Sequence, residues 1–230
     1  MDKSGLKVVL FDLDGTLLDT LDDLAAAVNH ALLVYGLPGR SRDEVRSFLG
    51  NGIRVLMERA VGEKAELDCF EQVFAVFRAY YLAHSMCRTD LYEGIRPMLA
   101  KLKERGLKIG IVSNKMQEAV TELYRRFFAD DVDVAIGEGP MLRRKPSPDM
   151  VYEALRQLGA RPDEALYVGD SEVDIRTAAD AGVRCLSVTW GFRDAAFLKE
   201  NGAVNLIDAP AGIVAYVDGL NEPRAIRTEV

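Results

Sequence analysis

The sequence has few cysteines and histidines and no long apolar run. Cys69, Cys87 and Cys185 are an odd number without CxxC spacing, which argues against a disulfide framework or a zinc site and favours reduced, mostly buried thiols. The two histidines leave little for a mechanism that needs a histidine cluster. The longest early apolar run, residues 8–11, is cut off by Asp12 and is too short for a signal peptide or a membrane span. We therefore expect a cytoplasmic protein.

Positive charge is also in short supply. The 29 Lys and Arg residues are outnumbered by 36 Asp and Glu, for a net charge of −7. A protein that binds the phosphate backbone of DNA or RNA needs the opposite balance, so we expect neither a nucleic acid nor a membrane as partner. With 49% hydrophobic and 28% charged residues in a chain of 230, the composition is that of a folded globular protein. An anionic ligand must therefore be bound by a local positive feature.

Short apolar runs that end in polar or glycine-containing turns recur along the chain. The first, residues 7–11, is closed by Asp12-Leu13-Asp14-Gly15-Thr16. Similar runs lie at residues 108–113, 132–136, 165–169 and 184–189. Helical patterns separate most of them, and one helix is predicted to begin with Ser147 as N-cap and Pro148 at its first position. Strands that alternate with helices predict an α/β fold with a doubly wound, mostly parallel, Rossmann-like sheet.

The stretch from about residue 20 to residue 83 breaks this alternation. Thr20 followed by Asp23 resembles a capping box, and helical periodicity continues over residues 43–61 and 67–83. An all-helical block thus interrupts the α/β protein after its first strand. The predicted domains are an α/β core of residues 1–19 and 88–230 and an inserted helical cap of residues 20–87.

Two carboxylates follow the first predicted strand. Asp12 and Asp14 are two residues apart, so they project to the same side of an extended chain, and both ionise there only with a cation nearby. This like-charged neighbourhood is a reason for Asp14 to hold a proton near neutral pH. A solvated acidic turn or a helix cap is the structural alternative.

Three further motifs carry polar groups at later strand ends or loops. Ser113 and Asn114 form either an anion cradle at a helix start or an ordinary N-cap pair. Residues 143–146, Arg-Arg-Lys-Pro, are the densest positive cluster and are either functional or a solvated loop. Asp170 ends a predicted strand and Asp174 lies in the first turn of the next helix, where acidic residues are also common because of the helix dipole.

The carboxyl ends of strands in an open α/β sheet line the ligand crevice, so these groups are expected to meet there. Several carboxylates in one crevice need a metal ion, and oxygen ligands without thiolate or imidazole select a hard ion, so Mg²⁺ is the expected cofactor. Mg²⁺, a lysine, a hydroxyl and a glycine turn together make a site for a phosphoryl group. The expected phosphate contacts are Gly15, Thr16, Ser113, Asn114 and Lys145.

These motifs occur in the order typical of the haloacid dehalogenase superfamily of phosphotransferases, which the chain resembles over essentially its whole length, the helical cap included. The resemblance implies that Asp12 is the nucleophile of an aspartyl-phosphate mechanism and Asp14 its general acid and base. It also implies a Mg²⁺ site made by Asp12, the backbone carbonyl of Asp14 and Asp170, with Asp174 in support. Ser113 and Lys145 would hold the phosphate.

Within the superfamily, residues 23–28 and 49–54 are similar to phosphoglycolate phosphatases. That similarity implies a small phosphorylated metabolite as substrate, with 2-phosphoglycolate preferred. Arg54 is a candidate for binding the substrate carboxylate because guanidinium forks suit carboxylates, and Asn51 and Gly52 lie in the same turn. An arginine on the surface of a helix is the alternative for Arg54.

Three other functions stay open from the sequence. One is a sugar-phosphate phosphatase, and another is a β-phosphoglucomutase-like phosphotransferase, whose relatives usually have Glu-Asp where this chain has Gly169-Asp170. The third, from a different class, is a catalytically silent phosphate-binding scaffold, which would be expected to lack Asp14 or Lys145. The protein is expected to be a monomer or a homodimer.

Overall fold

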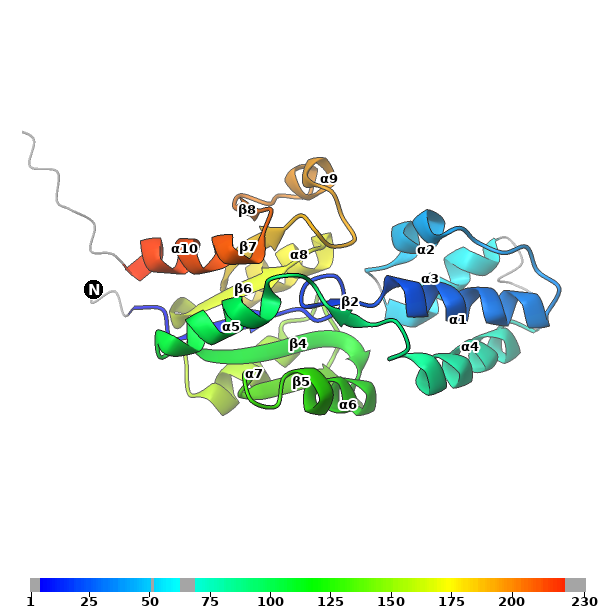
Figure 1. Ribbon diagram of the computed structural model, residues 1–230, viewed down its shortest axis with the longest axis horizontal. Helices are drawn as coiled ribbons and strands as arrows, with labels where there is room; N and C mark the ends of the chain where they lie inside the picture. The colour runs from blue at the N-terminus through cyan, green and yellow to red at the C-terminus, as the bar shows by residue number, and fades with distance from the viewer. Residues whose placement is uncertain (1–4, 51, 63–68, 222–230) are drawn as a thin grey trace, which may run out of the picture.

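The computed structural model describes residues 5–50, 52–62 and 69–221. It has two lobes, a core built around a sheet and a lobe made only of helices (Figure 1). Asn51, named above as a candidate site residue, lies outside the described residues. In the described ranges, none of the helices is both long and apolar enough to traverse a bilayer.

The core sheet is parallel throughout and has the strand order β5-β4-β1-β6-β7-β8, which confirms the predicted fold class. The strands are β1 (Val8–Phe11), β4 (Lys108–Met116), β5 (Val134–Glu138), β6 (Ala165–Gly169), β7 (Arg184–Val188) and β8 (Leu206–Ile207). Phe11 at the end of β1 pairs with Ile111 on one side and Val168 on the other. The residues that follow these strands therefore emerge together at one edge of the sheet.

Helices cover both faces of this sheet (Figure 1). One face packs against α5 (Ile95–Glu104), α6 (Gln117–Phe127) and α10 (Pro210–Asn221), and the other against α7 (Asp149–Leu158) and α8 (Glu172–Ala181). Residues of β1 alternate between the two layers: Val9 and Phe11 join the first, Val8 and Leu10 the second, and all are at most 1% exposed. A short 3₁₀ turn, Pro162–Glu164, precedes β6, and α9 (Ala195–Glu200) follows β7.

The helical lobe, called the cap below, consists of α1 (Leu21–Val34), α2 (Arg42–Phe48), α3 (Gly52–Val61) and α4 (Phe70–His84). A two-stranded antiparallel ribbon of β2 (Leu18–Asp19) and β3 (Asp90–Leu91) carries the chain into and out of it. The cap has its own apolar cluster, in which Leu32, Leu56 and Phe77 are fully buried. An inserted all-helical cap is thus confirmed, while the exact domain boundaries stay a prediction.

The helical stretch predicted over residues 43–61 is broken into α2 and α3. The break lies at two glycines with positive φ, Gly50 at 109° and Gly52 at 82°. Side chains rarely adopt this left-handed region, so glycine at both positions allows the sharp turn between the helices. Gly50 lies near Arg193 of the core, and Gly52 near Arg144.

The capping box predicted for Thr20 and Asp23 is wrong. Thr20 makes no side-chain capping hydrogen bond, and its buried Oγ1 has no partner among the described residues. The carboxylate of Asp23 instead accepts hydrogen bonds from the backbone of Arg88 and from the N–H and hydroxyl of Thr89, at 2.9–3.1 Å. Asp23, at the start of the cap, therefore binds the segment by which the chain leaves the cap. Local sequence spacing does not reveal this long-range contact.

Two local predictions also need correction. The helix α7 begins at Asp149 with Pro148 as N-cap, because the Ser147 hydroxyl donates to the Asp149 carboxylate at 2.9 Å instead of capping the helix. The three cysteines are free thiols, as expected, but they are not mostly buried: Cys87 is exposed and the other two are half-buried.

Candidate active site

Three carboxylates meet at the edge of the sheet where the strands end. Asp12 follows β1, Asp170 follows β6, and Asp174 lies in the first turn of α8. One carboxylate oxygen from each lies within 4.8 Å of those of the other two. All three residues are buried, with 8%, 1% and 0% of their surface exposed, respectively. The parallel register of β1 and β6 creates this cluster from residues more than 150 positions apart.

Lys145 supplies the positive charge inside the cluster. Its Nζ lies 2.8 Å from Oδ1 of Asp12 and 2.7 Å from Oδ1 of Asp174, and it donates to the Tyr167 hydroxyl at 3.1 Å. Burial alone would lower the pKa of Lys145, but the two carboxylates outweigh it and hold that pKa well above its usual value. Lys145 is therefore a permanent ammonium group.

One ammonium does not balance three buried carboxylates. Burial, with the neighbouring acids, raises the pKa of Asp12 well above its usual value. Burial and Asp174 raise the pKa of Asp170 to about 7. Both pKa shifts arise first from burial of the carboxylates and then from the acids beside them. The three residues bring carboxylate oxygens within 4.8 Å of one another, and a set of oxygen donors fits a hard divalent metal ion.

Asp170 is held by a narrow seat of backbone and hydroxyl donors. The Thr16 hydroxyl donates to its Oδ1 at 3.2 Å and the backbone N–H of Phe192 donates to its Oδ2 at 2.7 Å. A Cβ atom added to Gly15 or Gly191 would collide with the Asp170 carboxylate. Of the predicted phosphate contacts, Thr16 is fully buried and is used here to hold an acid. Gly15 provides room for that acid.

Asp174 is oriented by the start of its own helix. Its Oδ2 accepts hydrogen bonds from the Ser171 hydroxyl at 2.6 Å and the Ser171 N–H at 3.1 Å, in a capping box. Its Oδ1 is thereby left for Lys145 and the Tyr167 hydroxyl. Asp174 therefore does more than complement the helix dipole. One of its oxygens caps the helix and the other binds Lys145 in the acidic cluster.

Asp14 does not join the acidic cluster with its side chain. Both of its carboxylate oxygens accept hydrogen bonds from Nζ of Lys115, at 2.9 and 3.1 Å. The same ammonium donates to the Tyr81 hydroxyl of α4 at 2.6 Å. The expectation that like-charged neighbours surround Asp14 is therefore wrong, because its nearest charged partner is a buried lysine.

Lys115 is a site residue whose role the sequence pattern did not predict. A helix was expected directly after Ser113, but β4 continues to Met116, which pairs with Glu138 of β5. Along this extended segment Ser113 and Lys115 share one face because side chains alternate. Period-2 alternation from Ser113 was the signal that could have identified Lys115.

Ser113 and Asn114 take different positions. Ser113 is 2% exposed and lines the cavity above the acids. Asn114 forms a two-way clamp on the backbone of Lys145: its amide donates to the carbonyl at 3.1 Å and its oxygen accepts from the N–H at 2.7 Å. Asn114 thus fixes the loop that carries the ammonium.

A cavity of about 70 Å³ lies between the acidic cluster and the cap. Its walls include Asp12, Ser113 and Lys145 from the core and Gly52 at the start of α3 in the cap. Arg54 is not among the residues that line it. Its guanidinium forms two hydrogen bonds of 2.9 Å with Glu71, and its side chain is 45% exposed. The structure therefore brings the core motifs together but places Arg54 in a cap ion pair.

The cap and the core exchange hydrogen bonds beside the cavity. Arg46 of α2 donates to the backbone carbonyls of Gly191 and Phe192, and Arg193 of the core donates to the carbonyl of Leu49 at 2.7 Å. The Phe192 side chain packs into the apolar cluster of the cap. Residues 191–193 therefore both bind the Asp170 carboxylate and contact the cap.

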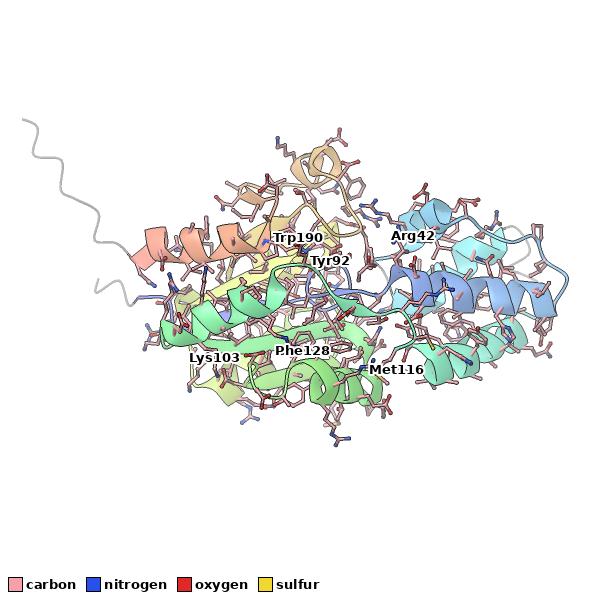
Figure 2. All side chains as sticks on the ribbon, viewed as in Figure 1. Arg42, Tyr92, Lys103, Met116, Phe128 and Trp190 are labelled. Carbon is pink, nitrogen blue, oxygen red and sulfur yellow. The ribbon has the colours of Figure 1, made fainter. Side chains whose placement is uncertain are left out.

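Figure 2 labels two further core side chains, Met116 near the cap and Trp190 within the core. Met116, at the end of β4, lies toward α4 and accepts a hydrogen bond from the Arg78 guanidinium on its sulfur at 3.5 Å. The indole N–H of Trp190 donates to the carbonyl of Thr16 at 3.1 Å. Met116 thus contacts a cap helix, and Trp190 binds the turn after β1 within the core.

Comparisons with known proteins agree with this arrangement. A family model for haloacid dehalogenase-like hydrolases matches residues 9–188. The chain is 34% identical over 213 residues to Phosphoglycolate phosphatase 1 of Pseudomonas aeruginosa, covering 88% of this chain and 76% of that protein. It is 35% identical over 188 residues to a phosphoglycolate phosphatase of Aquifex aeolicus, covering 81% of this chain and 86% of that one.

A solved structure shares the whole architecture. The crystal structure of a predicted phosphoglycolate phosphatase from Haemophilus somnus matches with a TM-score of 0.85 at 30% identity, over 93% of this chain and 98% of that one. The fold, the site and the family match place the chain in a single class of protein. It belongs to the haloacid dehalogenase-like hydrolase family, as an enzyme of its phosphatase class.

Proposed function

We propose that this enzyme hydrolyses a small phosphomonoester, with 2-phosphoglycolate as its preferred substrate, through an aspartyl-phosphate on Asp12 and with Mg²⁺ as cofactor. The observation that carries the proposal is the contact of Asp12 and Lys145, 2.8 Å apart, inside the acidic cluster at the floor of the cavity. A nucleophile, a fixed cation and a metal-binding cluster there meet the needs of phosphoryl transfer.

Asp12, Asp170 and the backbone carbonyl of Asp14 would hold the metal ion, with Asp174 at the edge of its site. When bound, Mg²⁺ would neutralise negative charge on the carboxylates and on the substrate phosphate. The donor set supports this choice because it consists of oxygen atoms, which suit a hard cation.

In the first step, the Asp12 carboxylate attacks phosphorus, a new oxygen–phosphorus bond forms, and the bond to the leaving alkoxide breaks. Lys145 reduces the repulsion between this carboxylate and the phosphate, and its contact with Asp12 Oδ1 fixes the direction of the attacking group. The Ser113 hydroxyl in the cavity wall is positioned to hold a phosphate oxygen. Asp14, as the general acid, gives a proton to the alkoxide, for which it must first leave its ion pair with Lys115.

In the second step, water attacks the aspartyl-phosphate and Asp14, now a carboxylate, removes a proton from it. The products are inorganic phosphate and the original Asp12 carboxylate, so the cycle closes. Between these steps Lys115 fixes the position of the Asp14 carboxylate, because its ammonium group donates to both carboxylate oxygens. Tyr81 in turn binds that ammonium group. The cap excludes bulk water while the intermediate exists.

The preference for 2-phosphoglycolate is supported by the named activity of the relatives and by the small cavity, which suits a compact substrate. The test is phosphate release from a panel of 2-phosphoglycolate, ethyl phosphate, hexose phosphates and p-nitrophenyl phosphate, with Mg²⁺ present. We expect the highest kcat/KM for 2-phosphoglycolate. A higher value for a hexose phosphate, or isomerised hexose phosphate without phosphate release, would instead support one of the two sugar-phosphate functions.

The Asp12→Asn variant tests the covalent step separately. We expect phosphate release to fall at least about 10³-fold, because the amide is a poor nucleophile. Acid-quenched wild-type enzyme should carry a phosphoryl group on the peptide that contains Asp12, and the variant should carry none. Near-normal turnover by the variant would refute Asp12 as the nucleophile.

A further inference from the structure

Arg144 has a different environment from the lysine that follows it. The Asn114 clamp on the backbone of Lys145 fixes this loop to the end of β4, and Lys145 turns its side chain into the buried acids. The Arg144 side chain is exposed and extends toward the cap. Neighbouring residues of one loop thus direct two cations to two different places.

The guanidinium of Arg144 lies against the cap turn that lines the cavity. A Cβ atom placed on Gly52 would lie 2.9 Å from Nη1 of Arg144 and 3.8 Å from its guanidinium carbon. Gly52 itself is part of the cavity wall, together with Ser113 and Lys145. Arg144 is not itself a lining residue of the cavity, but its guanidinium lies against Gly52, which is one, whereas Lys145 lines the cavity beside the acids.

Arg144 also differs from nearby arginines in its partners. Arg143 pairs with Asp149 at 2.8 Å, Arg54 with Glu71 at 2.9 Å and Arg193 with Glu172 at 3.0 Å. Within the parts of the chain that the structure describes, Arg144 has neither an ion-pair partner nor a side-chain hydrogen bond. Its guanidinium can therefore offer its donors to a ligand, whereas the charge of Arg54 is already matched in the cap.

We propose that Arg144 is the specificity-determining residue that binds the carboxylate of the substrate. This inference rests on the proposed phosphatase function. Lys145 would bind the phosphate and Arg144 a carboxylate a few bonds away, so the spacing of the two cations selects a compact substrate with two anionic groups. A guanidinium presents paired N–H donors that match the two oxygens of a carboxylate.

The test compares 2-phosphoglycolate with ethyl phosphate, in which a methyl group replaces the carboxylate. The preference ratio is kcat/KM for the first divided by kcat/KM for the second. It is measured with full-length enzyme and Mg²⁺ for the wild type, Arg144→Gln, Arg144→Lys and two controls, Arg143→Gln and Arg54→Gln. Melting temperatures check that every variant is folded, which we expect because these side chains are exposed.

We expect Arg144→Gln to lower the preference ratio about 10- to 100-fold, the range for losing a hydrogen bond to a charged group, with most of the change in KM for 2-phosphoglycolate. Arg144→Lys should recover part of the preference ratio, because lysine keeps the positive charge but lacks the paired N–H donors of the guanidinium. Arg143→Gln and Arg54→Gln should leave the ratio within about twofold, the range of a surface substitution of about 0.5 kcal/mol.

Other outcomes separate the two proposals. A wild-type enzyme without preference for 2-phosphoglycolate would refute the proposed substrate and the inference together. A wild-type preference that survives in Arg144→Gln, or that is lost in Arg54→Gln instead, would overturn the role of Arg144 and leave the proposed function intact.

Discussion

The hydroxyl of Tyr81 and the ammonium of Lys115 lie 2.6 Å apart, one on a cap helix and the other on a core strand. Both side chains are buried, and Lys115 makes its remaining side-chain hydrogen bonds to the carboxylate of Asp14. Burial raises the pKa of Tyr81, so it stays a neutral phenol whose oxygen accepts from the lysine. Asp14 is thus connected to the cap through one ammonium group.

The Tyr81→Phe variant removes this connection and keeps the ring. We expect kcat to fall about 5- to 10-fold, roughly 1 kcal/mol of barrier, because Lys115 would then be free to hold Asp14 in other orientations. The free energy of unfolding should fall by about 1–2 kcal/mol, because the charged donor loses a buried acceptor. Steady-state phosphate release and urea unfolding measure the two effects.

The neighbouring Tyr80→Phe variant is the matched control. Tyr80 is stacked between His30 and His84, each with ring centroids 4.1 Å away, and a phenylalanine keeps both stacks. We expect no change in kcat beyond twofold. Equal losses in the two variants would mean that Tyr81 acts only through the packing of the cap.

Metal binding should stabilise the folded enzyme. Burial, with the neighbouring acids, raises the pKa values of Asp12 and Asp170, and a divalent ion would offset the charge of both carboxylates. Mg²⁺ at 100 times its dissociation constant should therefore add about 2.7 kcal/mol to the free energy of unfolding. Melting temperatures with Mg²⁺ and with EDTA measure this. A Mg²⁺ effect of the same size in Asp170→Asn would contradict the assignment of this cluster as the metal site.

Without metal, the stability of the enzyme should depend on pH through Asp170. Its pKa is about 7 in the folded protein and about 3.9 in the unfolded chain, so between these values the folded state binds more protons. The contribution of Asp170 to the free energy of unfolding is therefore full below pH 4, is lost as pH rises to 7, and changes by at most about 1.4 kcal/mol per pH unit.

The measurement is urea unfolding in EDTA at pH 5, 6, 7 and 8, for the wild type and for Asp170→Asn. Because the asparagine does not titrate, the difference between the two curves isolates residue 170 from other acids. We expect the wild type to lose stability relative to the variant from pH 5 to pH 7 and to run parallel to it above. A constant difference over the whole range would show that Asp170 ionises at an ordinary pKa.

Gly191→Ala should damage the site through sterics alone. Its methyl group would collide with the carbonyl of Gly15 and with the Asp170 carboxylate, which the Thr16 hydroxyl and the Phe192 N–H hold in place. We expect a loss of about 1–3 kcal/mol in unfolding free energy and weaker binding of Mg²⁺. Gly139→Ala is the control, because nothing lies within 4 Å of its added carbon. Calorimetric titration with Mg²⁺ and urea unfolding separate the two variants.

Local patterns in the sequence were enough to predict the fold class and the motifs at the strand ends. Apolar runs such as residues 7–11 are short, continuous and closed by polar turns, which is what a strand buried on both faces requires. Parallel strands then bring the residues that follow them to the same edge. The meeting of Asp12, Asp170 and Lys145 was predictable for this reason.

Predictions that depended on nearby partners were less successful. Thr20 and Asp23 have the spacing of a capping box, but Asp23 is taken by Arg88 and Thr89, more than 60 residues away. Gly50 and Gly52 mark the break between α2 and α3. The helical spacing of apolar residues continues across these glycines, so that spacing alone predicted one stretch. Spacing describes neighbours along the chain and says nothing about competing donors.

Residue types and strand topology by themselves determined that acids, a lysine and a hydroxyl would share one edge of a parallel sheet. Only the tertiary structure decided which charge faces which. Asp14 pairs with Lys115, which also bonds Tyr81, Arg54 pairs with Glu71, and Arg144 lies beside Gly52 of the cavity wall. The physical reason is that an ion pair forms between whichever side chains the packing of the cap on the core brings within a few ångströms, and no local pattern encodes that packing.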